Sequence, residues 1–307
     1  MMAWLAALGV RARWIHARSR AVYGLNRRNV GLVYAHNARV HYPIADDKIL
    51  AKDILAAAGV PVPSTLVRVE ALWAIPECLA FLAGRDHFVV KPANGGGGNG
   101  IVVVAEWMGE GEWRRAGGGQ IDLIELRQHL AAILFGAFSR GAISDRVLVE
   151  PRIFPHEVYH GLYADGLCDV RVITLGARPV LAMVRVPTAR SGGRANLHQG
   201  GLGLAIDLGT GTVHRAVSRG RTLAVHPDTG APLVGLQLPH WTETLDVAIR
   251  AARAVPLGYL GVDIVVDRER GPLVLEINAR PGLEIQNVVG RGLGDALAAL
   301  RADVEGA

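Results

Sequence analysis

Cysteine, lysine and long apolar runs are all scarce in this 307-residue chain. Two cysteines, Cys78 and Cys168, are too few for a disulfide framework or for a zinc site built from thiolates. No apolar run reaches the roughly 18 residues that a membrane-spanning helix needs, which argues against an integral membrane protein. A reducing setting is the default for such a chain, so we expect a cytoplasmic protein.

Acidic residues are missing from positions 1–45, which hold seven arginines. The remainder has 26 basic and 28 acidic side chains, so the net charge of +5 comes from the N-terminus. An apolar stretch followed by RARWIHARSR predicts a basic helix over residues 1–21. This helix suits docking on a protein partner or on an anionic membrane surface, or packs on the body with its arginines in solvent. The slightly acidic body, with 6% aromatic residues, excludes nucleic acid as a partner.

Lysine accounts for only three of the 33 basic residues, at Lys48, Lys52 and Lys91. A lysine that persists in an arginine-rich chain indicates a place where a compact ammonium is needed and a planar guanidinium fails.

Apolar residues make up 50% of the chain, which predicts a large buried core. The pattern predicts helices over 46–57, 71–83, 121–136, 242–254 and 292–303, and an irregular stretch over 26–43. It predicts strands over 64–69, 87–92, 100–106 and 146–153, and hairpins within 169–187, 203–217 and 259–282. Helices mixed with successive hairpins favour an α+β fold with antiparallel sheets.

A glycine run at residues 95–100 separates two predicted strands. Its G-x-G-x-x-G spacing is not followed by a helix, so it does not meet the requirement of a Rossmann fingerprint. The unit suits a flap whose backbone N–H groups cover phosphates, with Lys91 at the end of the preceding strand. The alternative is a glycine-rich hairpin with no special role.

Oxygen-bearing side chains gather on the last predicted hairpin. Glu276 and Asn278 alternate with apolar residues and share one strand face, and Asp263 lies on the partner strand. Two carboxylates and a carboxamide are hard ligands that suit Mg²⁺ bridging nucleotide phosphates. The alternative is a solvated strand face. We expect Asp267, beside the turn, to be solvated.

Arginines form a third set, because a guanidinium suits bidentate capture of a carboxylate or an acyl phosphate. The candidates are Arg171, Arg185, Arg194 and Arg280.

The order of these motifs resembles that of the ATP-grasp ligases. The shared segments are DDK before a helix, FVVKP with the glycine flap, VLVEPRI, DVRVI, GVDIV and LEINARPG, spanning about residues 43–290. The chain resembles the RimK-type α-L-glutamate ligases, and also sugar-transfer-associated ATP-grasp proteins. Subgroup motifs are NRRN, YPIADDK, RANLHQGG, HPDTG and NARPGL.

The resemblance implies two α+β subdomains that grip ATP. Residues 43–150 would form the first, with the flap, and residues 151–307 the second, with the metal and substrate site. A basic helix and irregular segment over 1–42 would stand where such proteins usually carry a full pre-ATP domain. Because that domain helps to bind the carboxylate substrate, a partner docked on the arginine-rich N-terminus would present it here, with the protein peripheral at a membrane.

The resemblance also implies a nucleotide site. Lys48 and Lys91 would contact the phosphates, while Lys52 would be a solvated spare. Glu150 would accept a hydrogen bond from the adenine amino group, with Ile153 nearby. Further implied contacts are Gly96, Gly97 and Gly98 in the flap, and Asn196 and His198 in a loop facing the acceptor.

The implied activity is that of an ATP-dependent carboxylate–amine ligase working through an acyl phosphate. It would add glutamate or another amino acid to a peptide or small acceptor. Two Mg²⁺ ions, or Mn²⁺, would be held by Asp263, Glu276 and Asn278. The arginines near the γ-phosphate and the carboxylate would be Arg171, Arg185 and Arg280. Two alternatives stay open: a nucleotide-binding regulatory or scaffold module working with a membrane-associated partner, and an ATP-grasp phosphotransferase.

Overall fold

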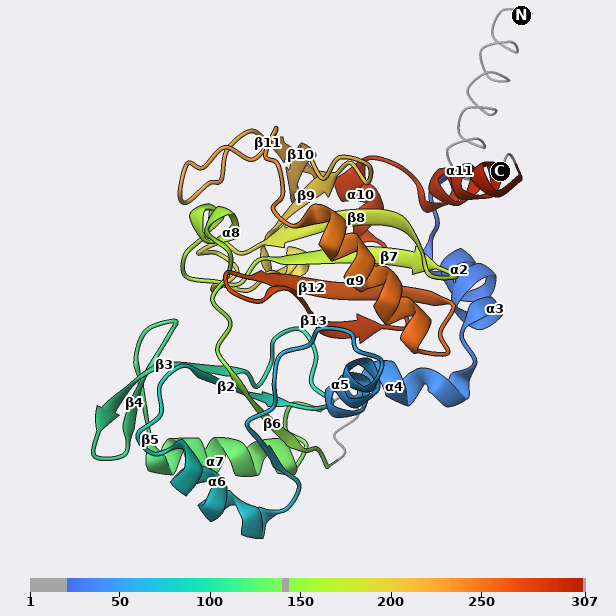
Figure 1. Cartoon of the computed structure of the whole chain (residues 1–307). Helices are drawn as coiled ribbons and strands as arrows, with labels where there is room; N and C mark the ends of the chain where they lie inside the picture. Colours follow the sequence, from blue (N-terminus) through green and yellow to red (C-terminus); the bar gives the residue numbers. More distant parts are fainter. Residues whose placement is uncertain (1–20, 140–143, 306–307) are drawn as a thin grey trace, which may run out of the picture.

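The computed structural model describes residues 21–139 and 144–305. Nearly all of the basic helix expected over residues 1–21 lies outside the described residues, so that expectation stays untested. The described part contains two sheets, of six and seven strands, and both are antiparallel, as the sequence predicts (Figure 1). No helix in this part is both long enough and apolar enough to cross a membrane.

The smaller sheet has the strand order β1-β6-β2-β3-β4-β5. Its strands are β1 (Val67–Val69), β2 (Phe88–Pro92), β3 (Val102–Gly109), β4 (Glu112–Arg115), β5 (Gln120–Asp122) and β6 (Val147–Pro151). Two helices, α6 (Ile75–Leu82) and α7 (Leu123–Leu134), pack against the sheet through Leu79, Leu126 and Leu130. Asp122 and Glu125 form a capping box that fixes the start of α7.

The larger sheet has the strand order β11-β10-β9-β8-β7-β12-β13. Its strands are β7 (Asp169–Leu175), β8 (Arg178–Val186), β9 (Leu202–Ile206), β10 (Val213–Ser218), β11 (Arg221–Leu223), β12 (Tyr259–Asp267) and β13 (Gly271–Asn278). The period of two sorts its apolar residues into two cores, so that Ala182 and Val184 face one and Leu181 and Met183 the other.

Helices cover both faces of the larger sheet (Figure 1). α9 (Trp241–Ala254) packs on one face through Val247, Ala248 and Ala251. The other face is covered by α10 (Glu284–Val289), α11 (Leu293–Glu305) and the N-terminal helical segment. Further short elements are the helices α4 (Tyr42–Asp46) and α8 (Glu157–Leu162) and the 3₁₀ turns at Arg39–His41, Leu72–Ala74 and Leu197–Gln199.

The expectation of an irregular stretch over residues 26–43 is wrong for most of its length. Helix α2 (Leu25–Arg28), a π-helical turn (Asn29–Val33) and α3 (Tyr34–His36) follow one another without a break. Leu32 and Val33 are buried in the core beneath the larger sheet. Helical conformation lets these apolar side chains reach the core while the backbone groups stay hydrogen-bonded.

Helix α5 (Lys48–Ala57) lies between the two sheets (Figure 1). Ala51 and Leu55 join the core of the larger sheet, whereas Ile49 packs on Ala93 and Leu148 beside the smaller one. Asp47 caps the helix by accepting from the backbone N–H groups of its first turn. α5 therefore carries its side chains into the space that separates the two sheets. The predicted subdomain boundaries at residues 42 and 150 stay a prediction.

Candidate active site

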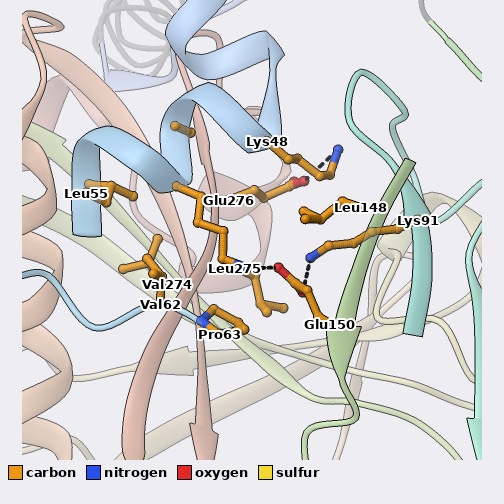
Figure 2. Close-up of a pocket in the computed structure, with 12 residues that line it drawn as sticks. Lys48, Leu55, Val62, Pro63, Lys91, Leu148, Glu150, Val274, Leu275 and Glu276 are labelled. Atoms are coloured by element: carbon orange, nitrogen blue, oxygen red, sulfur yellow. Dashed lines mark hydrogen bonds and ion pairs between the residues drawn. The ribbon is translucent and has the colours of Figure 1, made fainter. Parts of the chain in front are cut away.

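A pocket lies between α5, β2, β6 and β13 (Figure 2). All three lysines of the chain line it, together with Glu150 and Glu276. Its apolar lining comes from Ala51, Leu55, Val62, Pro63, Leu148, Val274 and Leu275. Apolar side chains beside a few charged groups match the chemistry of a nucleotide, whose base is apolar on its faces and whose phosphates are anionic.

Glu150 is the most enclosed charged group of the pocket, with 4% of its surface exposed. One carboxylate oxygen accepts from Lys52, and the other lies 2.5 Å from the Lys91 ammonium (Figure 2). The expectation that Lys52 is solvated is therefore wrong. Lys52 is 8% exposed, and burial lowers its pKa while the charge of Glu150 opposes that shift.

Lys48 stands at the first position of α5, at the mouth of the pocket. Its ammonium donates to the carbonyl of Gly95 in the flap and lies 3.7 Å from the Glu276 carboxylate (Figure 2). Its backbone N–H donates to the Ala93 carbonyl at the end of β2. Lys48 thus links the start of α5 to the flap of the smaller sheet and to the last strand of the larger one.

The glycine flap lies against a loop of the larger sheet, the one between β8 and β9. Gly97 and Gly98 have φ values of +66° and +80°, which L side chains rarely adopt. A Cβ placed on Gly97 would stand 3.8 Å from Nδ2 of Asn196, and one on Gly98 would stand 3.5 Å from Cδ of Arg194. The flap therefore approaches the loop between β8 and β9, and Gly96 precedes the two left-handed positions.

A second buried carboxylate, Asp263, lies in the larger sheet and is 1% exposed. Arg171 binds it with two hydrogen bonds of 2.7 and 2.5 Å, and Arg185 adds a third of 2.9 Å. Strand register dictates this cluster, since Asp263 is paired directly with Arg171 on β7 and with Glu276 on β13. Burial alone would raise the pKa of Asp263, but the two arginines hold it below its usual range.

Asp169 completes the arginine cluster, and the sequence analysis did not single it out. Its carboxylate accepts from Arg185 at 2.5 and 2.6 Å, so that Arg185 serves Asp169 and Asp263 together. Burial raises the pKa of Asp169 to about 6, against the opposing effect of Arg185. Its place in the DVR motif, two residues before Arg171, was the available signal.

The three expected metal ligands come together at the end of the β12–β13 hairpin. The Asn278 side-chain amide donates to Asp263 at 3.2 Å and to Glu276 at 3.5 Å. Two carboxylates and an amide oxygen in one cluster fit the hard-donor chemistry of Mg²⁺. Among the described residues no group of three or more acidic, histidine or cysteine side chains could hold a metal ion. The assignment of these three residues as ligands stays a prediction.

Three other expected site residues lie outside the pocket. Arg280 makes two hydrogen bonds to Asp46, and its side chain is 42% exposed. Ile153 is half-buried after β6 and is not among the residues that line the pocket. His198 is exposed, and its backbone N–H donates to the Asn196 side chain, which caps the turn at Leu197–Gln199.

The expectation that Asp267 is solvated is also wrong. Asp267 is 4% exposed and accepts from the Arg270 side chain at 2.9 Å. It also accepts from the backbone N–H groups of Glu269, Arg270 and Phe154. The carboxylate therefore closes the β12–β13 turn and ties it to the chain that connects the two sheets.

The HPDTG motif holds the loop that faces the flap. The ring of His226 lies 2.9 Å from the Pro187 carbonyl, and Asp228 accepts from the backbone N–H of Ala189 at 2.8 Å. Both contacts fix the first residues of the loop that carries Arg194 and Asn196.

The model of the family described as sugar-transfer associated ATP-grasp matches residues 27–302. The chain is 28% identical over 255 residues to the probable alpha-L-glutamate ligase of Xanthomonas axonopodis pv. citri (strain 306), covering 80% of this chain and 60% of that protein. It is 29% identical over 255 residues to the ribosomal protein bS6–L-glutamate ligase of Escherichia coli O7:K1 (strain IAI39 / ExPEC), covering 82% of this chain and 61% of that protein.

The chain thus spans about 60% of the length of these curated relatives. Among solved structures, the ATP-grasp ligase PsnB complexed with minimal precursor is 18% identical with a TM-score of 0.46, covering 87% of this chain and 63% of that one. Because the family model matches nearly the whole described chain, the protein belongs to the sugar-transfer associated ATP-grasp family, with the ATP-grasp fold that its motifs predict.

Proposed function

We propose that this protein is an ATP-dependent ligase that joins a carboxylate to an amine and releases ADP and phosphate. The observation that carries the proposal is the convergence of all three lysines of the chain with Glu150 and Glu276 on one pocket. Membership of the sugar-transfer associated ATP-grasp family supports it, and so do the names of two curated relatives, a probable alpha-L-glutamate ligase and a ribosomal protein bS6–L-glutamate ligase.

In this proposal the nucleotide lies with its base toward Glu150 and its phosphates toward Lys48 and the flap. Glu150 is an acceptor at the enclosed end, which suits the amino group of adenine and disfavours the carbonyl oxygen of guanine. Lys48 and the backbone N–H groups of Gly96–Gly98 stand at the open end, where phosphate charge needs neutralising.

The reaction has two steps. A substrate carboxylate oxygen attacks the γ-phosphorus, the bond to the β–γ bridging oxygen breaks, and ADP leaves with that oxygen. An amine then attacks the acyl carbon, phosphate leaves with the former carboxylate oxygen, and the nitrogen loses a proton to give an amide. Arg171 and Arg185 are held by Asp263 and Asp169 beside the hairpin that carries Glu276, and in this proposal their remaining guanidinium N–H groups donate to the oxyanion.

Asp263, Glu276 and Asn278 would hold Mg²⁺ in this proposal. The ion would supply neutralisation of the triphosphate charge during transfer.

We propose an amino acid or a peptide as the source of the carboxylate, and glutamate as the first candidate. Arg194 stands beside the flap at Gly98, and a guanidinium suits a substrate carboxylate. The relatives named as glutamate ligases support the same class.

The test is ADP release from Mg-ATP with a panel of amino acids and short peptides, followed by mass analysis of products. The carboxylate of the responding substrate is then labelled with ¹⁸O. The proposal expects one ¹⁸O atom to appear in the released phosphate, since that oxygen transfers with the acyl phosphate. Lys91→Ala and Glu276→Ala should each lower the rate by at least about a hundredfold. Arg114→Ala, at an exposed ion pair on β4, is the matched control and should keep the rate.

Two other outcomes would contradict the proposal. ADP release with the phosphoryl group retained on a substrate would indicate a phosphotransferase. ATP binding with no turnover across the panel would favour a regulatory or scaffold module.

A further inference from the structure

Glu150 is a buried carboxylate that forms ion pairs with two lysines, one at each oxygen. The side chains of Lys52 and Lys91 are each 9% exposed, and that of Glu150 is 5% exposed. One ammonium is enough to neutralise one carboxylate, so the second places a net positive charge in the enclosed end of the pocket. Unneutralised buried charge is unfavourable, so the second lysine points to a functional role.

The two lysines come from different parts of the fold. Lys91 and Glu150 stand on adjacent strands β2 and β6 of the smaller sheet. Lys52 reaches the same carboxylate from α5, whose residues Ala51 and Leu55 pack in the core of the larger sheet. A further bond from the Lys52 ammonium to the Ser64 carbonyl, at 3.3 Å, gives the lysine a second partner besides Glu150. Lys52 is therefore anchored independently of Lys91.

The position of Lys91 suits a different task. Its strand leads directly into the glycine flap, and it shares the pocket with Lys48, whose ammonium bonds to the flap at Gly95. To contact a nucleotide, the Lys91 ammonium has to weaken its 2.5 Å contact with Glu150. A buried carboxylate left without any cation would oppose that movement strongly.

We propose that Lys52 is the permanent counter-ion of Glu150, and that it frees the Lys91 ammonium to turn to the bound nucleotide. The inference rests on the proposed function, since it assumes that a nucleotide enters this pocket. Lys52 is then a positioning residue, because it acts on the nucleotide through Glu150 and Lys91. It also explains why a compact ammonium stands here in a chain that otherwise uses arginine, since a forked guanidinium would occupy both oxygens of Glu150.

The test is a double-mutant cycle read by calorimetric titration of the full-length protein with the non-hydrolysable analogue AMPPNP and Mg²⁺. Lys52→Met leaves Lys91 as the sole cation of Glu150, and we expect the Kd to rise by about tenfold or more. Glu150→Gln removes the need for a counter-ion. In that background, adding Lys52→Met should raise the Kd by less than about threefold, because the neutral Gln side chain at position 150 leaves no buried carboxylate that loses a counter-ion.

Thermal unfolding of the same four proteins separates a positioning role from a structural one. If Lys52 only stabilises the fold, Lys52→Met lowers Tm and leaves the Kd of the folded protein unchanged, which would overturn the inference. A tenfold rise in Kd in the Glu150→Gln background would overturn it too, and this comparison holds even if Lys52→Met alone does not fold. A wild-type protein that binds no nucleotide would overturn the proposed function itself. If the wild-type protein binds the nucleotide but the effects of Lys52→Met and Glu150→Gln on the binding free energy simply add, only the role of Lys52 is overturned.

Discussion

Two buried carboxylates of this protein are each held by two cations. Glu150, in the smaller sheet, has Lys52 and Lys91. Asp263, in the larger sheet, has Arg171 and Arg185. An ammonium is a point charge on a flexible stem, whereas a guanidinium is a planar fork that fixes the angle of its partner. The lysine pair therefore suits a contact that changes when a ligand arrives, and the arginine pair suits one that presents its carboxylate at a fixed angle.

The surroundings of the two carboxylates agree with this difference. Asp263 lies mid-sheet between β7 and β13, and Arg185 also binds Asp169, so that each group limits the movement of the next. Glu150 lies at the enclosed end of a pocket, and both of its lysines line that pocket. The arginine cluster thus stands beside the expected metal ligands, and the lysine pair stands beside the proposed position of the base.

The largest effect should follow from breaking the arginine pair. Arg185→Ala leaves Asp169 without its cation and Asp263 with one fewer. We expect the free energy of unfolding to fall by about 3–5 kcal/mol, because removing one partner leaves buried charge uncompensated. Urea denaturation followed by far-UV circular dichroism measures this change.

Arg178→Ala is the matched control, since Arg178 is exposed on the same strand, β8. It should change stability by less than about 0.5 kcal/mol. A similar small change for Arg185→Ala would show that water or movement of the sheet compensates the two carboxylates, and the rigid character assigned to this cluster would be wrong.

A smaller effect should follow from loosening the strands that carry Asp263. Asn37 donates to the carbonyls of Tyr259 and Ala279 at 2.7 and 2.9 Å, and accepts from the backbone N–H of Tyr259 at 2.9 Å. These bonds join the start of β12 to the residue after β13. Asn37→Ala leaves buried backbone groups unsatisfied, so we expect a loss of about 2–3 kcal/mol of stability in urea denaturation.

The exposed Asn287 provides the control for this change, and Asn287→Ala should be close to neutral. If Asn37→Ala is equally mild, the N-terminal segment does not support the hairpin that carries the expected metal ligands.

Exchanging lysine and arginine tests the difference between the Glu150 and Asp263 sites directly. Arg171→Lys loses the fork that binds Asp263 and should lower stability by about 1–2 kcal/mol. Lys91→Arg should leave stability nearly unchanged but weaken AMPPNP binding by about tenfold, because a fork on Glu150 resists release. Denaturation and calorimetric titration of both variants measure the two effects. Tight nucleotide binding by Lys91→Arg would show that exchange at Glu150 is not needed.

Much of this arrangement follows from sequence periodicity. Alternation along β13 places Glu276 and Asn278 on one face, and the short turn of the hairpin brings Asp263 opposite Glu276. The larger helices and three hairpins lie where the pattern predicts them. Among the elements that the pattern missed, the strands β4, β5 and β11 are three or four residues long, too short for a period to show.

The misjudged residues have a different cause, which is contact between distant parts of the chain. Lys52 follows Lys48 by one helical turn, and this i, i+4 spacing was a signal that both share the pocket face. Its burial depends on Glu150, 98 residues away. Asp267 is buried partly by the chain at Phe154, 113 residues away. Neither partner can be identified from local pattern, because nothing local fixes how α5 or the connection after β6 packs.

Asp267 should give the smallest effect. Unlike Glu150 and Asp263, which each have two cations, it is held by one arginine and by backbone N–H groups. Burial alone would raise its pKa, but the hydrogen bonds from Arg270 and from two backbone N–H groups lower it to about 2, below the ordinary value of 3.8. A lowered pKa in the folded state adds stability that is complete above pH 4 and is lost as the pH falls toward 2. Relative to Asp267→Asn, the wild-type protein should lose about 1 kcal/mol over that interval, after allowance for solvent screening. Urea denaturation at pH 6, 4 and 2.5 measures the difference, with the exposed Asp165→Asn as the control. A wild-type advantage that does not shrink in acid would show that geometry at the turn, and not the charge of Asp267, closes the β12–β13 hairpin.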